Sequence, residues 1–332
     1  MRVLPATSAG HGGGVAAHRT PRLLRICLAL AVIVLLASVA AQQPAVRSLL
    51  VAPKADGPTG PLEADYSSAG RYATTTQVVA DPAGTTHYQL FRPADYATLG
   101  FRSPIVTWGD GTGASPTRYS ALLDHLASYG FTVIAPDQHN TGSGDEIAAA
   151  ARYLIAQDGT VGSVFHGRLD VDRVAAAGHS QGAGGAVRAA TGNPGLFDTV
   201  VTFSLPSKTW VTANADCPSK SDCMFDVTRL SQPVFLIGTH GVFDAVIASA
   251  STERDFYDQV PGRAALGLIE SSGGKAADHN SVADGDGPRG FLGYVTAWLC
   301  AELRGDTVAA AAFDGTRPEL VGNANWPGSA AR

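Results

Sequence analysis

The sequence predicts an α/β fold in which a mostly parallel sheet is covered on both faces by helices. Three observations support this prediction. Short apolar segments alternate with segments of helical periodicity, and 45% of the 332 residues are apolar, which is enough for a large core. One apolar segment runs directly into a Gly-x-Ser-x-Gly turn at 178–182. Such alternation is typical of βαβ units, so we expect one domain without an evident lid.

The first half of the regular region opens with a strand pair, 76–80 and 86–93, joined by the turn sequence Asp-Pro-Ala-Gly. An apolar strand at 104–109 then runs into a glycine-rich loop. Apolar residues at helical spacing predict a helix over 116–129, and a buried strand follows at 131–137. This order already contains one βαβ unit.

The second half continues the same alternation. An amphipathic helix is followed by a strand that leads into a small-residue helix, and three more apolar strands precede a closing helix. The predicted strands are 174–180, 199–205, 233–239 and 265–270, and the predicted helices are 146–156, 181–191 and 288–305.

The N-terminal segment differs from the rest of the chain. Four arginines precede the apolar run Ile26–Ala41, which ends in small residues that suit a cleavage site. We therefore predict a secretory signal peptide over 1–41; the alternative is an uncleaved membrane anchor, although the run is short for a bilayer. After it we expect a Pro/Ala/Gly-rich linker over 42–70, a catalytic domain over 71–315 and a flexible tail over 316–332.

The composition excludes some classes of partner. The formal charge of −5 becomes −9 without residues 1–41, because that segment carries four arginines and no acidic residue. A chain this acidic offers no electrostatic attraction to nucleic acid or to anionic membranes. We expect a secreted monomer that contacts a membrane only if its N-terminal segment is retained.

The cysteines are consistent with export. Cys217 and Cys223 bracket a short polar loop and predict a local disulfide in an oxidising compartment. Their spacing does not suit zinc and no nearby histidine completes a site, so we expect neither a metal nor a cofactor. Cys300 lies in the closing helix and is expected to be a buried, unpaired thiol.

Ser180 is the candidate nucleophile. In the sequence Gly178-His179-Ser180-Gln181-Gly182 the serine lies at a sharp strand-to-helix turn, where the glycines avoid collisions. The pentapeptide alone is weak evidence in a chain with 38 glycines. Its position between a strand and a small-residue helix makes it considerably stronger.

A serine nucleophile requires a base and an acid that orients it. His279 follows the last predicted strand and precedes the closing helix, which is where hydrolases built on this turn place the base. Asp244 is the first carboxylate after the strand 233–239 and is the candidate acid. The alternatives are a surface histidine and a helix N-cap, respectively.

The oxyanion would be bound by two backbone N–H groups. One belongs to Gln181, the residue after the nucleophile. The second comes from the loop after 104–109: strand alignment indicates Gly111, whereas spacing from the following helix indicates Thr112. The sequence leaves both open.

Three segments carry a family resemblance. The strand, turn and helix at 170–190, the acid loop after 233–239 and the closing helix at 293–306 resemble the cutinase and polyethylene terephthalate hydrolase branch of the α/β-hydrolases, which has chlorophyllase-like relatives. The resemblance covers about residues 72–313. It implies that Ser180, Asp244 and His279 are nucleophile, acid and base.

The resemblance also suggests residues that contact substrate. Trp210 is similar in position to a substrate-wall tryptophan of the family; the alternative is a packing role. Trp108, just before the oxyanion loop, is the second candidate. Gln181 departs from the methionine usual in the family.

The predicted function is a secreted, metal-independent serine esterase that hydrolyses carboxylic esters or polyesters through an acyl-enzyme. The alternatives are another activity of the same superfamily, namely a lipase, acyltransferase or peptidase, and a catalytically inactive binding module. No segment between 205 and 233 suggests a helical lid, so the site is expected to be open.

Overall fold

The computed structural model describes residues 57–211, 217–283 and 285–332, and all of them belong to one compact unit, Ala52–Arg332. The predicted signal peptide and most of the predicted linker lie outside the described residues. Within the described ranges, no helix is both long and apolar enough to cross a bilayer.

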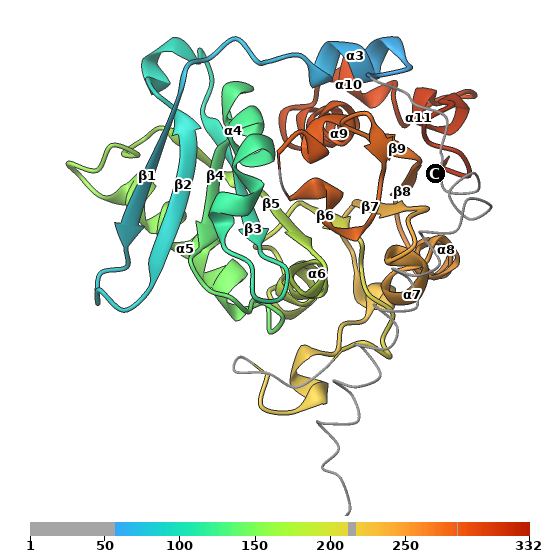
Figure 1. Ribbon diagram of the computed structural model, residues 1–332. Coiled ribbons are helices and arrows are strands. Elements are labelled where there is room, and N and C mark those ends of the chain that lie inside the picture. Colours follow the sequence, from blue (N-terminus) through green and yellow to red (C-terminus); the bar gives the residue numbers. More distant parts are fainter. Residues whose placement is uncertain (1–56, 212–216, 284) are drawn as a thin grey trace, which may run out of the picture. The chain divides into compact units, whose positions relative to one another are not determined.

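A nine-stranded sheet forms the centre of this unit (Figure 1). Its strand order is β1-β2-β4-β3-β5-β6-β7-β8-β11. The six central strands β4, β3, β5, β6, β7 and β8 run parallel to one another, whereas β1, β2 and β11 add antiparallel pairs at the two edges. The bounds are β1 Thr74–Ala80, β2 His87–Pro93, β3 Ser103–Gly109, β4 Thr132–Pro136, β5 Leu169–His179, β6 Thr199–Phe203, β7 Val234–Thr239, β8 Ala264–Ile269 and β11 Ala330–Ala331.

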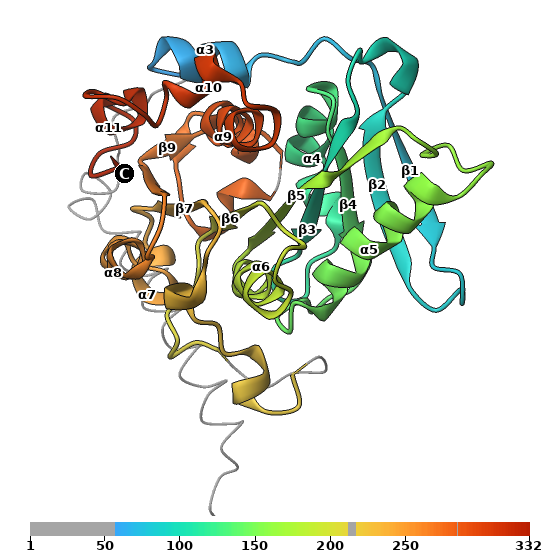
Figure 2. The same ribbon diagram turned by 180° about the vertical axis from the view of Figure 1, so that it is seen from behind.

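Helices cover both faces of the sheet, and an apolar core lies on each face (Figure 2). The helices α4 and α9 contribute to one core, while α5, α6 and α8 contribute to the other. The strands β9 Ser271–Ser272 and β10 Lys275–Ala276 form a separate small hairpin. The helix bounds are α3 Pro61–Ser67, α4 Ser120–Ser128, α5 Asp145–Gly159, α6 Gln181–Gly192, α7 Asp244–Ile247, α8 Ala250–Gln259, α9 Leu292–Arg304, α10 Thr307–Ala310 and α11 Glu319–Gly322.

The predicted fold class is confirmed. All eight predicted strands are present, and each is buried where an apolar run was expected, apart from the edge strand β1. The predicted helix over 116–129 begins as a short 3₁₀ turn at Pro116–Tyr119 and continues as α4. Parallel strands place their carboxyl ends at one edge of the sheet, so the loops after β3, β5, β6 and β7 meet there.

The two ends of the described chain are more ordered than expected. The predicted linker contains α3, and the predicted tail contains α11, β11 and Trp326, whose indole is fully buried. Glu63 joins these two ends: its carboxylate accepts hydrogen bonds from Trp326 Nε1 at 2.8 Å and from Asn323 Nδ2 at 2.7 Å. The small, aperiodic residues around these anchors concealed this packing from a pattern-based prediction.

Candidate active site

Ser180 lies at the turn between β5 and α6. Its backbone has φ 54° and ψ −117°, an uncommon conformation for a non-glycine residue, and its N–H donates to Phe203 O at 2.8 Å. Side chains at the flanking glycines would collide with the backbone: Gly178 faces Gly182, and Gly182 faces the carbonyl of Gly109. The turn therefore needs both glycines, and it presents the serine hydroxyl at the carboxyl edge of the sheet.

Three side chains that are distant in sequence form a hydrogen-bonded series at this turn. His279 Nε2 lies 3.0 Å from Ser180 Oγ, and His279 Nδ1 lies 2.7 Å from Asp244 Oδ1. Asp244, at the start of α7, is fully buried, and the side chain of His279 is 6% exposed. Since a carboxylate only accepts, His279 Nδ1 donates to Asp244, which leaves Nε2 to accept the proton of the serine.

Two hydroxyl groups orient the carboxylate of Asp244. Ser204 and Thr239, each at the end of a strand, donate to Asp244 Oδ2 at 2.8 and 2.7 Å. Asp278 holds the segments of Asp244 and His279 together, because its Oδ1 accepts from the N–H groups of both residues at 2.9 and 2.8 Å. Sequence analysis missed these three residues; the signal available was their position at strand ends or beside the base.

A second buried carboxyl supports the same region. Glu253 in α8 is fully buried, and its Oε1 accepts from the N–H of Leu205 at 2.7 Å. Burial, and next the charge of Asp244, hold the pKa of Glu253 well above its usual range, which favours the uncharged form of this side chain. The hydrogen bond from Leu205 to Glu253 fixes the backbone directly after Ser204, which has a positive φ of 48°.

The loop after β3 offers two backbone N–H groups as oxyanion donors. The N–H of Gly111 is already engaged, because it donates to the hydroxyl of Tyr119 at 3.0 Å. Thr112 instead lines the pocket that contains Ser180. Gln181 is the first residue of α6, so its N–H has no intrahelical carbonyl to bond. The available pair is thus Gln181 and Thr112.

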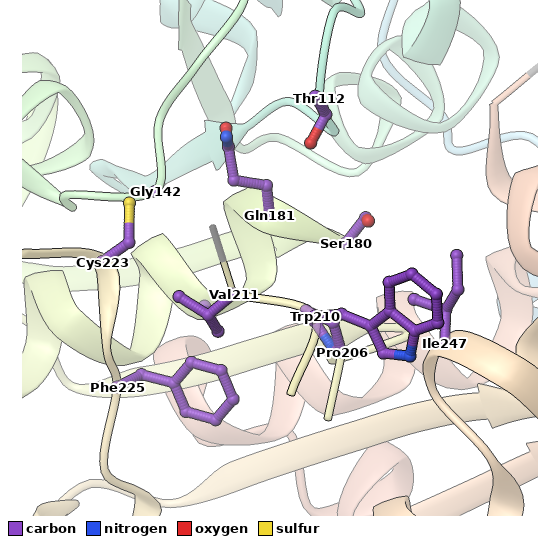
Figure 3. A pocket seen from close by; sticks show the side chains of 11 residues that line it. Thr112, Gly142, Ser180, Gln181, Pro206, Trp210, Val211, Cys223, Phe225 and Ile247 are labelled. Atoms are coloured by element: carbon purple, nitrogen blue, oxygen red, sulfur yellow. The ribbon is translucent and has the colours of Figure 1, made fainter. Parts of the chain in front are cut away.

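A pocket of about 140 Å³ opens beside Ser180 (Figure 3). Trp210 and Ile247 lie near the serine, while Val211 and Phe225 lie farther along the pocket. Its lining is mostly apolar, which is typical of a site for a small organic group. The remaining lining residues are Thr112, Gly142, Gln181, Gly184, Pro206 and Cys223.

The two candidate tryptophans have different environments. Trp210 borders the pocket, and its Nε1 donates to Val246 O at 2.8 Å, which fixes the indole. Trp108, in contrast, is 1% exposed and packs against Tyr119 and Phe203 in the core, so its indole is not positioned to contact a substrate. The expectation for Trp108 is therefore corrected.

The predicted disulfide is confirmed and borders the site. Cys217 is bonded to Cys223, and Cys223 lines the pocket. The side chain of Gln181 lies next to the same glycine, Gly142, as Cys223 does, and its Oε1 accepts from Thr141 N at 3.0 Å. The glutamine thus anchors the loop after β4. Cys300 is buried and unpaired, as expected, and burial raises its pKa to about 12.

Asp110, in the loop after β3, is expected to make stability depend on pH. Burial raises the pKa of this carboxyl to about 8, from 3.8; a hydrogen bond from Trp108 opposes the shift and the charge of Asp137 adds to it. The folded chain therefore keeps a proton that the unfolded chain has lost. The free energy of unfolding should fall as pH rises from 4 to about 8, by at most about 1.4 kcal/mol per pH unit.

Asp110→Asn tests this dependence, because asparagine can still accept from Trp108 and carries no charge. We expect the variant to gain stability relative to the wild type as pH rises from 5 to 9 in urea unfolding experiments. Asp65→Asn, at an exposed position in α3, is the control. A stability difference between Asp110→Asn and the wild type that is the same at every pH would contradict the prediction.

Comparisons with known proteins find similarity to PET hydrolase-like proteins and cutinases. Residues 51–309 match the model of a family described as PET hydrolase-like. The chain is 28% identical to a bis(hydroxyethyl) terephthalate hydrolase of Streptomyces coelicolor over 205 residues, which are 60% of this chain and 57% of that protein. It is 25% identical to cutinase est2 of Thermobifida alba, over 75% of this chain and 72% of that one. Cutinase 1 of Thermobifida cellulosilytica is 26% identical, over 68% and 74%.

Proposed function

Because the chain belongs to the PET hydrolase-like family, we propose that it is a secreted serine hydrolase that cleaves carboxylic esters through an acyl-enzyme. The observation that carries this proposal is the series Ser180–His279–Asp244 beside an apolar pocket. The names of the relatives, cutinase and bis(hydroxyethyl) terephthalate hydrolase, support ester substrates. Secretion is supported by the disulfide, which forms and persists in oxidising compartments.

The first half of the reaction forms the acyl-enzyme. His279 Nε2 takes the proton from Ser180 Oγ as the oxygen attacks the ester carbonyl carbon. The buried carboxylate of Asp244 stabilises the resulting imidazolium. The N–H groups of Gln181 and Thr112 bind the oxyanion of the tetrahedral intermediate. His279 then returns the proton to the alcohol oxygen, which leaves as the carbon–oxygen bond breaks.

The second half repeats these roles with water. His279 Nε2 takes a proton from a water molecule, whose oxygen attacks the acyl carbon. The second tetrahedral intermediate is bound by the same two N–H groups. When it collapses, Ser180 Oγ leaves and recovers its proton from His279, and the carboxylic acid is released.

The pocket favours small apolar groups as part of the substrate. About 140 Å³ is roughly ten times the space that one water molecule needs, and Phe225 and Val211 line its far part (Figure 3). Esters with a short acyl chain or a single aromatic ring match this size. Longer groups would have to extend outside the pocket.

A panel of esters tests the function. p-Nitrophenyl acetate, butyrate and decanoate, bis(hydroxyethyl) terephthalate, a peptide and a polyester film are each incubated with the wild type. We expect the fastest release for the short acyl chains, slower release for decanoate and none for the peptide. Absence of hydrolysis across all of the esters would favour a binding module instead.

Trp210 is proposed to contact the substrate. Its indole is held beside the pocket by the bond to Val246 O, and an aromatic contact contributes about 0.5–1.5 kcal/mol beyond its area burial. Trp210→Ala should therefore raise the KM for bis(hydroxyethyl) terephthalate up to about tenfold. The KM for p-nitrophenyl acetate should change less.

Trp210→Phe is the matched control, because it keeps an aromatic ring but loses the pyrrole ring of the indole and with it the donor to Val246. We expect it to recover most of the affinity for the aromatic ester. Equal KM values for the wild type and Trp210→Ala with both substrates would show that the tryptophan only packs.

A further inference from the structure

His179, the residue before the nucleophile, is a buried histidine with no part in the reaction proposed above. Its Nε2 lies 2.8 Å from the main-chain oxygen of His279, and its Nδ1 lies 3.0 Å from the hydroxyl of Tyr119. A carbonyl oxygen only accepts, so His179 Nε2 carries the hydrogen and donates it to His279. The geometry alone thus shows that Nε2 of the His179 ring is protonated.

The hydrogen-bonding role of Nδ1, the other ring nitrogen, follows from the charge of His179. The side chain is buried, and burial, followed by the charge of His279, holds the pKa of His179 well below its usual range. Arg118 also disfavours the charged form, while the bond to the carbonyl of His279 opposes the shift. His179 is therefore neutral, and its Nδ1 accepts a hydrogen bond from Tyr119.

Tyr119 extends the series to the oxyanion loop. Since its hydroxyl hydrogen points to His179, its oxygen can accept the N–H of Gly111, 3.0 Å away. The phenol ring is 1% exposed and packs against Trp108. A directed series of hydrogen bonds thus runs from Gly111 N–H through Tyr119 and His179 to the carbonyl of His279.

The two ends of this series lie in different parts of the proposed catalytic machinery. Gly111 directly precedes Thr112, whose N–H is the proposed second oxyanion donor. At the other end is the backbone of the base, His279, and His179 itself is bonded covalently to Ser180. The loop after β3, the turn after β5 and the segment after β10 come from separate elements. Within the described residues, this buried series links all three.

The close fit at Gly111 supports the same interpretation. A Cβ at this position would lie 2.8 Å from His179 Nδ1 and 3.1 Å from the Tyr119 hydroxyl. Both are closer than a carbon atom normally approaches. A side chain at this position would therefore push the loop away from both polar groups, and glycine allows the close approach.

We propose that Tyr119 and His179 are positioning residues. They hold the oxyanion donor Thr112 and the base His279 in the correct positions relative to Ser180. This inference rests on the proposed serine hydrolase function. Neither side chain contacts the substrate; each acts through the backbone of a neighbouring segment. Preorganised donors act mainly on the transition state, so loss of the series should lower kcat and leave KM nearly unchanged.

Tyr119→Phe is the direct test, since it removes one oxygen atom and keeps the ring. Loss of an oxyanion donor costs about 10²–10³ in rate, and here the donor is displaced rather than removed, so we expect about a tenfold loss of kcat. kcat and KM are measured with p-nitrophenyl butyrate. The second-order rate of phosphonylation by a fluorophosphonate should fall by a similar factor.

Tyr96→Phe is the matched control. The hydroxyl of Tyr96 is also buried and bonded, to Thr132 Oγ1 at 2.7 Å, but it belongs to the opposite core. This variant should lose stability by a similar amount and keep the wild-type kcat. A merely structural role for Tyr119 predicts that the two variants behave alike.

Gly111→Ala tests the series from its other end and serves if Tyr119→Phe does not fold. The added methyl group should displace the same loop and again lower kcat rather than raise KM. If both variants fold, the double variant should be little worse than either single one, because both break one series.

The outcomes separate the two proposals. A selective loss of kcat in either variant, with Tyr96→Phe unaffected, supports the positioning role. A wild type that reacts with the fluorophosphonate, together with variants whose kcat equals that of Tyr96→Phe, overturns the inference and leaves the proposed function standing. A wild type that neither reacts nor hydrolyses esters overturns both.

Discussion

Replacing Ser180 with alanine is expected to abolish ester hydrolysis, with a loss of about 10⁶-fold in kcat. The physical reason is that the acyl-enzyme cannot form without the hydroxyl, whereas the pocket and the oxyanion donors remain. The serine is held only by its backbone and by the bond to His279, so the variant should fold normally. Release of p-nitrophenol from the butyrate ester is the measurement.

Ser120→Ala is the control for this variant, since that hydroxyl lies in α4 and bonds only to Thr117 O at 2.7 Å. It should retain wild-type activity. If Ser180→Ala keeps more than about one hundredth of the wild-type rate, another group is the nucleophile and the assignment of Ser180 fails.

Asp244→Asn should produce the second largest loss, about 10⁴-fold in kcat. Ser204 and Thr239 both donate to Oδ2 of the aspartate, and in the variant they would keep the amide oxygen on their side. The amide NH₂ group would then face His279 Nδ1 and donate to it. His279 would carry its hydrogen on Nε2, where it cannot accept the proton of the serine.

Ser204→Ala separates the effect of the His279 tautomer from the loss of a hydrogen bond that orients Asp244. It removes one of the two donors to Asp244 and leaves the carboxylate, so we expect a loss of about tenfold or less. A variant Asp244→Asn with kcat within tenfold of the wild type would mean that the carboxylate does not set the tautomer of the base.

Local patterns allowed much of the site to be predicted. Ser180 could be predicted because its turn is encoded within five consecutive residues between an apolar strand and a helix. Asp244 and His279 could be predicted from their order along the chain, and the structure places both at the same edge of the sheet as Ser180. The family resemblance, based on those segments, is confirmed.

The side-chain environment could not be predicted in the same way. The proposal of Thr112 rather than Gly111 as an oxyanion donor rests on the hydroxyl of Tyr119, eight residues from Gly111, which accepts the N–H of Gly111. Consecutive side chains of a strand point to opposite faces, and Trp108 falls on the face that packs against Tyr119. The sequence of a single segment does not show how a strand aligns with its neighbours or which side chains pack against it.

Residues that support the site were the hardest to recognise. Ser204 and Thr239 are ordinary strand-end residues in the sequence, and Glu253 resembles one more charge in an amphipathic helix. Only the packing of α8 against β7 shows that Glu253 is fully buried beside the acid. The C-terminal segment was misjudged for a related reason: it is anchored by tertiary contacts that no local pattern shows, among them the bonds of Asn323 and Trp326 to Glu63.

The proposed reaction depends most on Ser180 acting as an activated nucleophile. The direct measurement is to treat the wild type, Ser180→Ala and His279→Ala with a fluorophosphonate and to map the adduct by peptide mass spectrometry. We predict a single adduct on Ser180 in the wild type, formed with loss of fluoride, none in Ser180→Ala and very slow labelling in His279→Ala. An adduct on another residue, or equally fast labelling of His279→Ala, would show that Ser180 is not a nucleophile activated by His279.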